Sequence, residues 1–372
     1  MIHKPYILLL SVLLLLNSCI SEFIPQTSED KEILVVEGLI TDQPGANSIK
    51  LSKSMPLGGR SAAKPLSGCV VTVFDNLGSK VTFTESEAGN YIPSSSFHGV
   101  IGRIYTLNVK LNSALNNISY ESFPMEMKSI PEIDSVYYEK KIIVASSGSG
   151  QPQEGCQIYL NTQDPTNQCK FYRWEYAETW EFILPYAVAN KTCWISSNSD
   201  VINIKNTSAF TEDKINRYPL NFISNETDRL RVKYSILVKQ YSLNEDEYLY
   251  WEKLQNISQQ VGGLYDIIPS SIPSNVYSQN DPTEKVLGYF SVSASSSKRI
   301  FIKDNFIGLV DLYKDCAQDT IFNFNPIPNL NSTVWVIIEH TLPPPSYRII
   351  TYSKGCADCT ARGTNIIPDF WK

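Results

Sequence analysis

The strand predicted over residues 171–182 carries a row of aromatic rings that includes one carboxylate. Side chains alternate between the two faces of a strand, so one face carries Tyr172, Trp174, Tyr176, Glu178, Trp180 and Phe182. Such rings stack on sugars and peptides, which would make the row a ligand platform with Glu178 as its polar anchor. In the alternative that we favour, the rings lie in the core and Glu178 pairs with an Arg or Lys from a neighbouring strand, because an unpaired buried charge is costly.

Residue types that commonly carry catalysis are scarce in this chain. Its histidines are His3, His98 and His340. This scarcity weighs against zinc hydrolases and against histidine-based triads, which need a positioned imidazole. Glycine-rich phosphate-binding motifs and the serine nucleophile elbow do not occur in the sequence. We therefore expect no enzymatic activity, no metal site and no cofactor.

Pairs of acids leave one catalytic alternative open. Glycoside hydrolysis needs two carboxyls about 5–10 Å apart on either side of the substrate. Glu175 with Glu181, or Asp311 with Asp315, could be proposed for that role, but nothing in the pattern singles them out. We interpret these acids as solvated side chains.

The N-terminal segment predicts export and lipidation. His3 and Lys4 precede an apolar run from Tyr6 to Leu16 that is too short to span a bilayer as a helix, which needs about 20 residues. The segment ends in Leu16-Asn17-Ser18-Cys19, which resembles the bacterial lipobox, where the cysteine thiol receives a diacylglyceryl group and the peptide is cut before it. Residues 1–18 are thus predicted to be a lipoprotein signal peptide and Cys19 the lipidation site.

Export also changes the interpretation of the remaining cysteines, since disulfides form outside the cytoplasm. Six candidates lie beyond residue 150, namely Cys156, Cys169, Cys193, Cys316, Cys356 and Cys359. Cys356-Ala-Asp-Cys359 has the spacing of a redox motif but lacks a βαβ context, and a zinc site would need two further ligands. We expect these two cysteines to bond different partners upstream, whereas Cys69 is predicted to be a small buried hydrophobic residue.

Charge and composition limit the class of protein. The 372 residues contain 32 Lys and Arg against 38 Asp and Glu, a formal charge of −6 without a basic run. This balance lacks the electrostatic signature of nucleic-acid binding. An apolar content of 42% with 11% aromatics is sufficient for packed cores, and the length suggests two domains.

The elements that must position these residues are mainly strands. After a flexible tether at residues 19–31, short strands and turns with no helix between them predict an immunoglobulin-like β-sandwich over residues 32–128. Strands are expected at residues 34–40, 69–74, 80–84 and 102–109. Such modules are often spacers, and a fold alone assigns no activity.

The second region, residues 129–372, is predicted to be a larger β-rich domain with one amphipathic helix. Strands are expected at residues 137–145, 158–160, 171–182, 230–241, 286–292, 299–302, 334–338 and 347–352. Asn244 and Glu247 form a candidate capping box for the helix, whose apolar stripe is Tyr250, Leu254, Ile257 and Val261. Gly262-Gly263 would end the helix, and residues 264–284 are predicted to be a long irregular loop of the kind that is often functional or mobile.

Several segments together resemble a known family of lipoproteins. They are the lipobox, Leu34-Val-Val-Glu-Gly38, Tyr172-Arg-Trp-Glu-Tyr-Ala-Glu178, residues 234–243, Tyr248-x-x-Trp251, Val286-Leu-Gly-Tyr-Phe290, Cys356-Ala-Asp-Cys-Thr360 and Pro368-Asp-Phe-Trp371. The combination is similar to a family of Bacteroidota outer-membrane lipoproteins that is classified only as a domain of unknown function. Members of this family are commonly encoded beside TonB-dependent receptors. The resemblance implies a lipid-anchored outer-membrane protein, facing outward, and supplies no catalytic residues.

Three functions follow as hypotheses. The first is an accessory or binding subunit beside a TonB-dependent transporter, which captures or admits a nutrient. The second is a structural or assembly lipoprotein of an envelope complex, and the third, least favoured, is a surface hydrolase. Ligand-dependent thermal stabilisation separates the first from the second, because a ligand that binds only the folded state raises its stability.

Overall fold

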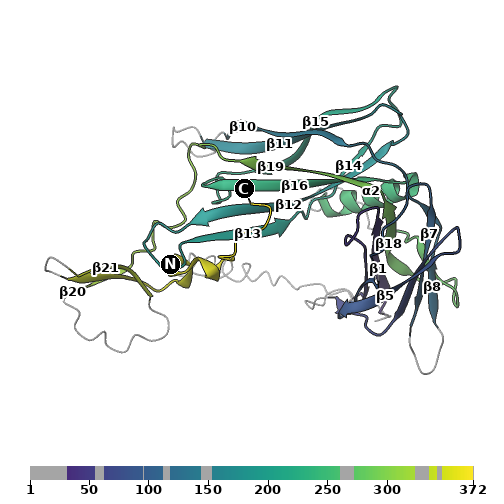
Figure 1. Ribbon diagram of the computed structural model, residues 1–372, viewed down its shortest axis with the longest axis horizontal. Coiled ribbons are helices and arrows are strands. Elements are labelled where there is room, and N and C mark those ends of the chain that lie inside the picture. Colours follow the sequence, from purple (N-terminus) through teal and green to yellow (C-terminus); the bar gives the residue numbers. More distant parts are fainter. Residues whose placement is uncertain are drawn as a thin grey trace, which may run out of the picture.

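The computed structural model describes residues 32–54, 63–94, 96–111, 118–143, 153–259, 272–322, 335–341 and 346–371. The described chain is mainly β, as predicted, and is built from four sheets. Figure 1 shows long strands in one half of the molecule, the N-terminal strands in the other, and helix α2 (Glu245–Gln259) where the halves meet. Cys19 and the predicted signal peptide and tether lie outside the described residues, as do the predicted helix stop at Gly262-Gly263 and the stripe residue Val261.

The N-terminal sheet follows the order β17-β8-β7-β4-β5-β6-β2-β1-β18, with β3 beside β2 and β9 beside β7. Its strands are β1 (Leu34–Thr41), β2 (Ser48–Lys53), β3 (Lys64–Pro65), β4 (Val70–Asp75), β5 (Lys80–Glu87), β6 (Asn90–Pro93), β7 (Ile104–Lys110), β8 (Ser119–Ser122), β9 (Met125–Glu126), β17 (Val276–Ser278) and β18 (Val286–Ser293). The Asn275 amide exchanges two 2.8 Å hydrogen bonds with the backbone of Phe290, which links the two ends of this path. The sheet therefore curls around its own core.

Two strands of this sheet come from the second half of the chain. β18 lies parallel to β1, with Leu34 opposite Val286 and Thr41 opposite Ser293, and β17 pairs with β8. The predicted division into residues 32–128 and 129–372 therefore does not separate the two units, because the N-terminal unit is complete only with residues 276–293. β17 also places regular structure inside the stretch predicted to be an irregular loop. The immunoglobulin-like topology remains a prediction.

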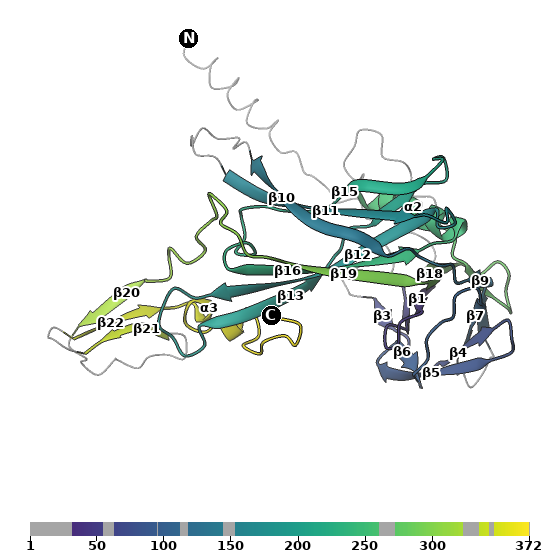
Figure 2. The same ribbon diagram turned by 45° about the horizontal axis from the view of Figure 1, so that its top comes forward.

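The second unit is a sandwich of two sheets. One contains β10 (Ile133–Ile143), β11 (Gln153–Asp164) and β15 (Asp213–Ile223). The other contains β12 (Phe171–Ile183), β13 (Thr192–Asn198), β14 (Asn203–Asn206), β16 (Lys233–Ser242) and β19 (Ser295–Ile302). Figure 2 shows the two layers, and one apolar cluster joins residues of both, including Ile158 and Leu160 of β11 with Tyr172 and Trp174 of β12.

The fourth sheet extends from the sandwich in the C-terminal part of the chain (Figure 1). It consists of β20 (Asp319–Phe322), β22 (Tyr347–Thr351) and β21 (Trp335–His340), and it is followed by the short helices α3 (Lys354–Ala357) and η1 (Cys359–Ala361). Within the described parts of the chain, no helix is long and apolar enough to cross a bilayer.

Helix α2 begins where the sequence predicts but differs in detail. Asp246 and Glu245 lie exposed in its first turn, where acids favour the positive end of the helix dipole. Glu247, predicted to close a capping box, instead lies fully buried, so that part of the prediction is wrong. The predicted stripe residues Tyr250, Leu254 and Ile257 are half-buried.

Candidate functional site

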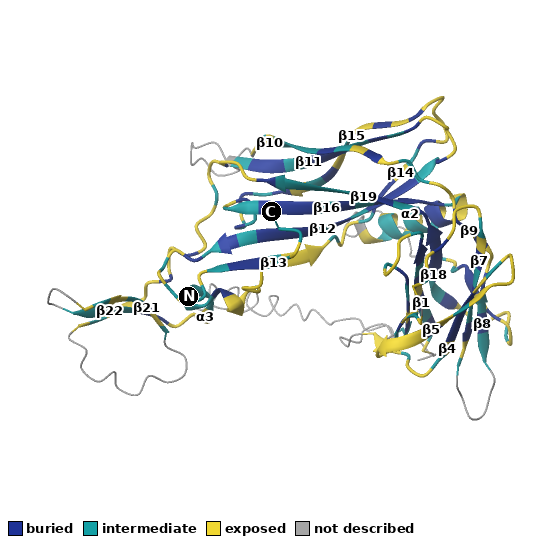
Figure 3. Ribbon diagram, in the orientation of Figure 1, coloured by how far each residue is buried: buried dark blue, intermediate teal, exposed yellow. Residues whose placement is uncertain are grey.

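The aromatic row of β12 lies in the core of the sandwich. Tyr172, Trp174, Tyr176, Glu178 and Trp180 are all at most 8% exposed. Figure 3 shows β12 and β16 largely in the colour of buried residues. The ligand-platform interpretation is therefore wrong, since the rings present no surface to a ligand, and the core alternative describes the row.

Glu178 is paired inside this core. The Tyr234 hydroxyl donates a 2.7 Å hydrogen bond to it, and Arg229 forms a 3.2 Å ion pair with it. Arg229 also stacks over the Trp180 ring at 5.2 Å. The partner arginine thus comes from the turn before β16 rather than from the body of a neighbouring strand, and Glu178 is a structural carboxylate.

The cysteines form two disulfides, Cys193–Cys359 and Cys316–Cys356. As predicted, Cys356 and Cys359 bond different partners upstream. Cys156 and Cys169 are free and buried in the sandwich core, so their assignment as disulfide candidates is wrong. Burial raises the pKa of both thiols to about 12, which keeps them protonated and unreactive.

Cys69 lies half-buried against the N-terminal core, in keeping with a small hydrophobic role. Its backbone N–H donates a 3.0 Å hydrogen bond to the Tyr91 hydroxyl. Burial raises the pKa of its thiol as well.

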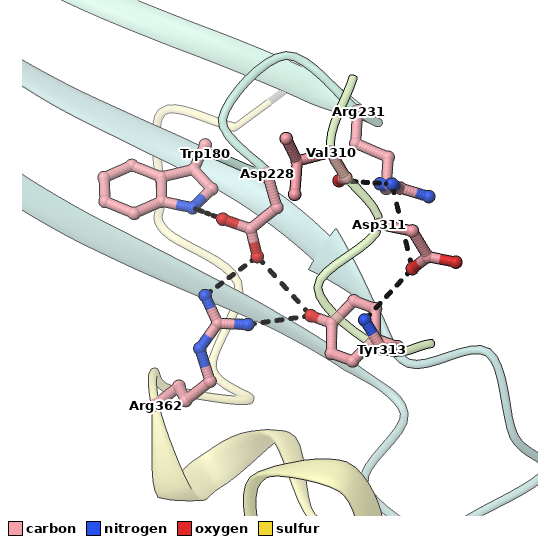
Figure 4. A network of polar contacts seen from close by, with 7 residues as sticks. All are labelled: Trp180, Asp228, Arg231, Val310, Asp311, Tyr313 and Arg362. Atoms are coloured by element: carbon pink, nitrogen blue, oxygen red, sulfur yellow. Dashed lines mark hydrogen bonds and ion pairs between the residues drawn. The ribbon is translucent and has the colours of Figure 1, made fainter. Parts of the chain in front are cut away.

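A cluster of four side chains, which we call the Asp228 clamp, fixes the C-terminal segment to the sandwich (Figure 4). One Asp228 oxygen accepts from Trp180 Nε1 at 3.2 Å; the other accepts from Arg362 at 2.9 Å and from the Tyr313 hydroxyl at 3.4 Å. Arg362 also donates to the Tyr313 oxygen at 2.8 Å. Every oxygen of the buried carboxylate is partnered, as a purely structural site requires.

A cavity of about 450 Å³ lies at the junction of the two units, and we call it the junction cavity. Strand alternation in β1 explains its position: Leu34, Val36 and Ile40 fill the N-terminal core, whereas Val35, Glu37 and Leu39 point to the opposite face. Helix α2 covers that face. The apolar part of the cavity wall consists of Val35, Leu39, Tyr250, Trp251, Leu254 and Tyr289.

Four charged side chains line the junction cavity, and their charges balance. Glu37 and Lys50 are exposed and lie opposite each other on β1 and β2. Arg173 and Glu175 enter from the beginning of β12 and are paired through an Arg173–Glu175 hydrogen bond. Two acids and two bases leave the lining without net charge.

Arg173 is the best-positioned of these side chains. It is 6% exposed and is held between two rings, 4.3 Å from the Trp251 centroid and 4.9 Å from that of Tyr241. These contacts fix the guanidinium plane, as cation–π stacking does. Its Nε–H nevertheless has no hydrogen-bond partner among the described residues.

Glu247 lies beside the same cavity. Its neighbours Trp251 and Ser291 both line the cavity, and Trp251 Nε1 donates to its Oε1 at 3.4 Å. Its Oε2 is buried and, within the part of the chain that is described, has no partner. Burial raises the pKa of Glu247 to about 7, although the hydrogen bond with Ser291 and the neighbouring Arg173 lower it.

The junction cavity therefore combines apolar walls with the buried Arg173, and Glu247 lies behind the wall residues Trp251 and Ser291. Arg173 and Glu247 each have one hydrogen-bonding atom without a partner among the described residues. Sites for small ligands are concave, mostly apolar and carry a few convergent polar groups. Among the described residues, no cluster of three or more His, Cys, Asp or Glu side chains could hold a metal ion. The arrangement is suited to binding.

Sequence reasoning missed both buried groups. Strand alternation puts Arg173 on the face of β12 opposite the aromatic row, where no pattern predicts its burial, and Glu247 was predicted to close a helix capping box. A signal for Glu247 did exist, because Glu247, Tyr250, Trp251 and Leu254 follow the i, i+3, i+4, i+7 spacing of one helix face. A carboxyl on such a stripe indicates a buried acid.

Comparison with protein families shows which family the chain matches. A domain of unknown function (DUF4249) matches residues 20–299, more than half of the 372 residues. The match includes β1, the aromatic row of β12, helix α2 and β18, and thus every wall of the junction cavity. A comparison with curated proteins found no match. The chain therefore belongs to the DUF4249 family.

Proposed function

We propose that this protein is a lipid-anchored protein of the outer-membrane surface that serves as a non-catalytic accessory or binding subunit beside a TonB-dependent transporter. In this role it captures or admits a nutrient. The observation that carries the proposal is Cys19 at the end of Leu16-Asn17-Ser18-Cys19. The family match begins at residue 20, directly after this cysteine, which supports a mature domain that starts at the lipidated residue.

A lipid anchor suits the rest of the chain. Each buried CH₂ group of an acyl chain contributes about 0.8 kcal/mol, so two or three chains hold a protein firmly on a membrane. Residues 20–31 supply Ser, Glu, Pro, Gln and Thr between the anchor and β1, a composition typical of a tether. The folded units can therefore sit beside a membrane protein while the acyl chains hold them in place.

The junction cavity favours a binding role over a scaffold role. A scaffold needs no concave site with an apolar wall and a few polar groups, whereas a capture subunit does. The resemblance to lipoproteins encoded beside TonB-dependent receptors supports the choice of partner. A structural or assembly role in an envelope complex is the alternative.

The anchor is tested with Cys19→Ser, and Cys69→Ser is the matched control because it also removes a single cysteine thiol. We expect intact-mass analysis to find the wild-type and Cys69→Ser chains cut before residue 19 and acylated, and both chains in the membrane fraction. In Cys19→Ser we expect residue 19 to carry no acyl group and the protein to be absent from the membrane fraction. An unmodified thiol at Cys19 in the wild-type protein would contradict the proposal.

The partner is tested by cross-linking in intact cells, purification of the tagged wild-type protein from membranes, and mass spectrometry. Enrichment of a TonB-dependent receptor, lost in Cys19→Ser and retained in Cys69→Ser, is the expected result. Recovery of another envelope complex in place of a receptor would favour the structural alternative.

A further inference from the structure

The junction cavity also restricts the chemistry of its ligand, an inference that rests on the proposed binding role. Buried polar atoms without partners cost about 1–3 kcal/mol each, so a native site that keeps them needs an explanation. Arg173 Nε–H is a donor, and Glu247 Oε2 accepts or, when protonated, donates. Both atoms lie beneath the cavity surface, so the polar groups that a ligand can contact are the paired Arg173 and Glu175 side chains of the lining. A hydroxyl group suits this pair, because it can accept from the guanidinium and donate to the carboxylate.

The aromatic walls favour a ring with a weakly polar face. Tyr250 and Tyr289 lie with their centroids 4.7 Å apart, and the Trp251 ring stands nearly perpendicular to Tyr250, at 83°. These three rings carry the negative faces of their π systems, which attract the slightly positive C–H groups of a saturated sugar ring. Such a ring also presents hydroxyls at its edge, where charged side chains can reach them.

The balanced charge of the lining disfavours a ligand with net charge. Glu37 and Glu175 are offset by Lys50 and Arg173, so an anionic or cationic ligand would add an uncompensated charge beside a partly desolvated site. The volume of about 450 Å³ is within the range of small-molecule sites, roughly 300–1,000 Å³.

We propose that the junction cavity binds a neutral mono- or disaccharide, with its ring against Tyr250, Trp251 and Tyr289 and its hydroxyls on the paired Arg173 and Glu175 side chains that line the cavity. A charged sugar is disfavoured by the balanced lining, and a zwitterionic dipeptide is disfavoured because its two full charges would have to be desolvated beside aromatic walls.

The test uses the full, processed protein in a sugar-free zwitterionic detergent. Thermal unfolding and calorimetric titration are run with neutral mono- and disaccharides, a uronic acid, an amino sugar and a dipeptide. At least one neutral saccharide is expected to raise Tm and bind with a measurable Kd, ahead of its charged counterparts. Absence of binding by every neutral saccharide, or preference for the dipeptide, would overturn the proposal.

Variants place the ligand in the cavity. Trp251→Leu removes a stacking face and should weaken saccharide binding about tenfold, a loss typical of an aromatic contact. Leu249→Ala, on the exposed face of the same helix, should leave Kd unchanged. Equal binding by Trp251→Leu and wild type would show that the ligand sits elsewhere and would overturn the assignment.

Charge variants test the selectivity. Glu37→Gln gives the lining one net positive charge and should raise affinity for the uronic acid, whereas Lys50→Gln should raise affinity for the amino sugar. Both residues are exposed, so neither change disturbs the core. None of these binding assays depends on the lipid anchor or on a transporter. A negative result for saccharide binding therefore does not affect the proposed anchor at Cys19, and a negative result for the anchor does not affect the proposed saccharide site.

Discussion

Asp228 and Glu247 are both buried acids, but their surroundings differ. Both Asp228 oxygens are bonded, to Trp180, Arg362 and Tyr313, and the group joins the C-terminal segment to the sandwich. Glu247 contacts Trp251 and Ser291, and its Oε2 is unpartnered within the described residues. The first site is complete within the chain, whereas the second leaves hydrogen-bonding capacity beside a cavity.

The difference separates structural from binding polar groups in this fold. A buried charge that is fully paired fixes one packing arrangement, and removal of one partner leaves the others uncompensated. A buried charge that is incompletely paired lowers stability until a ligand or water completes it. The three predictions below test this distinction, from the largest expected effect to the smallest.

The Cys193–Cys359 disulfide should contribute most, because it closes a loop over a sequence separation of 166 and fixes the segment that carries Arg362 to the clamp. Loop entropy gives about 5 kcal/mol for a loop of this length. The double variant Cys193→Ser/Cys359→Ser should lose about that free energy of unfolding in guanidinium titrations.

The matched control is Cys316→Ser/Cys356→Ser, which removes the disulfide with a sequence separation of 40. Its loss should be smaller, about 4 kcal/mol by the same relation. A larger loss from the control than from Cys193→Ser/Cys359→Ser would contradict the role given to the longer loop.

Asp228→Ala should lower the free energy of unfolding by about 3 to 4 kcal/mol, because it leaves Arg362 and Trp180 Nε1 without their acceptor. The control is Asp311→Asn, which removes a neighbouring acid that pairs with Arg231 at 3.9 Å and is 57% exposed. Exposed pairs contribute at most about 1 kcal/mol, so this change should be small. Similar losses in the two variants would show that the clamp is no stronger than a surface ion pair.

Glu247→Gln tests whether the incompletely partnered Glu247 makes the free energy of unfolding depend on pH. The folded pKa of about 7 lies above the ordinary 4.5, so between these values the folded chain holds a proton that the unfolded chain releases. The free energy of unfolding therefore falls as pH rises from about 4.5 to about 7, by about 3 kcal/mol, and is level above that. Glu247→Gln should lack this fall in denaturation curves measured across the same range.

Asp246→Asn, an exposed acid of the same helical turn, is the control and should keep the wild-type pH dependence. If the free energy of unfolding of Glu247→Gln still fell with pH as in the wild type, another group would be responsible. Glu247 would then not belong in the comparison with Asp228.

Local patterns predicted much of the fold. The alternation of side chains over residues 171–182 predicted β12 and its buried row. The helical spacing of apolar residues after Asn244 predicted helix α2. The core alternative for the aromatic row followed from the tendency of apolar strand faces to be buried, and the cost of an unpaired charge predicted a partner for Glu178, which the structure shows. These features depend on neighbours a few residues apart, which is why the sequence displays them.

The junction cavity could not be predicted in the same way. Its walls combine β1, β12, α2 and β18, and the pairing of Val36 with Gly288 joins positions that are far apart in the chain. Gly288 has φ +83°, and a Cβ there would lie 2.0 Å from the Val36 carbonyl oxygen, so this close approach requires glycine. From the sequence alone, one glycine in a predicted strand does not indicate that another strand must approach it this closely.

The sequence by itself determined the lipobox, the strand alternation, the position of α2 and the number of cysteines available, because each is written in adjacent or periodic residues. Only the tertiary structure decided which four cysteines pair, which acids are partnered and where the cavity lies. The physical reason is that pairing and desolvation depend on distances between segments brought together by the collapse of two cores, and those distances have no local signature in the chain.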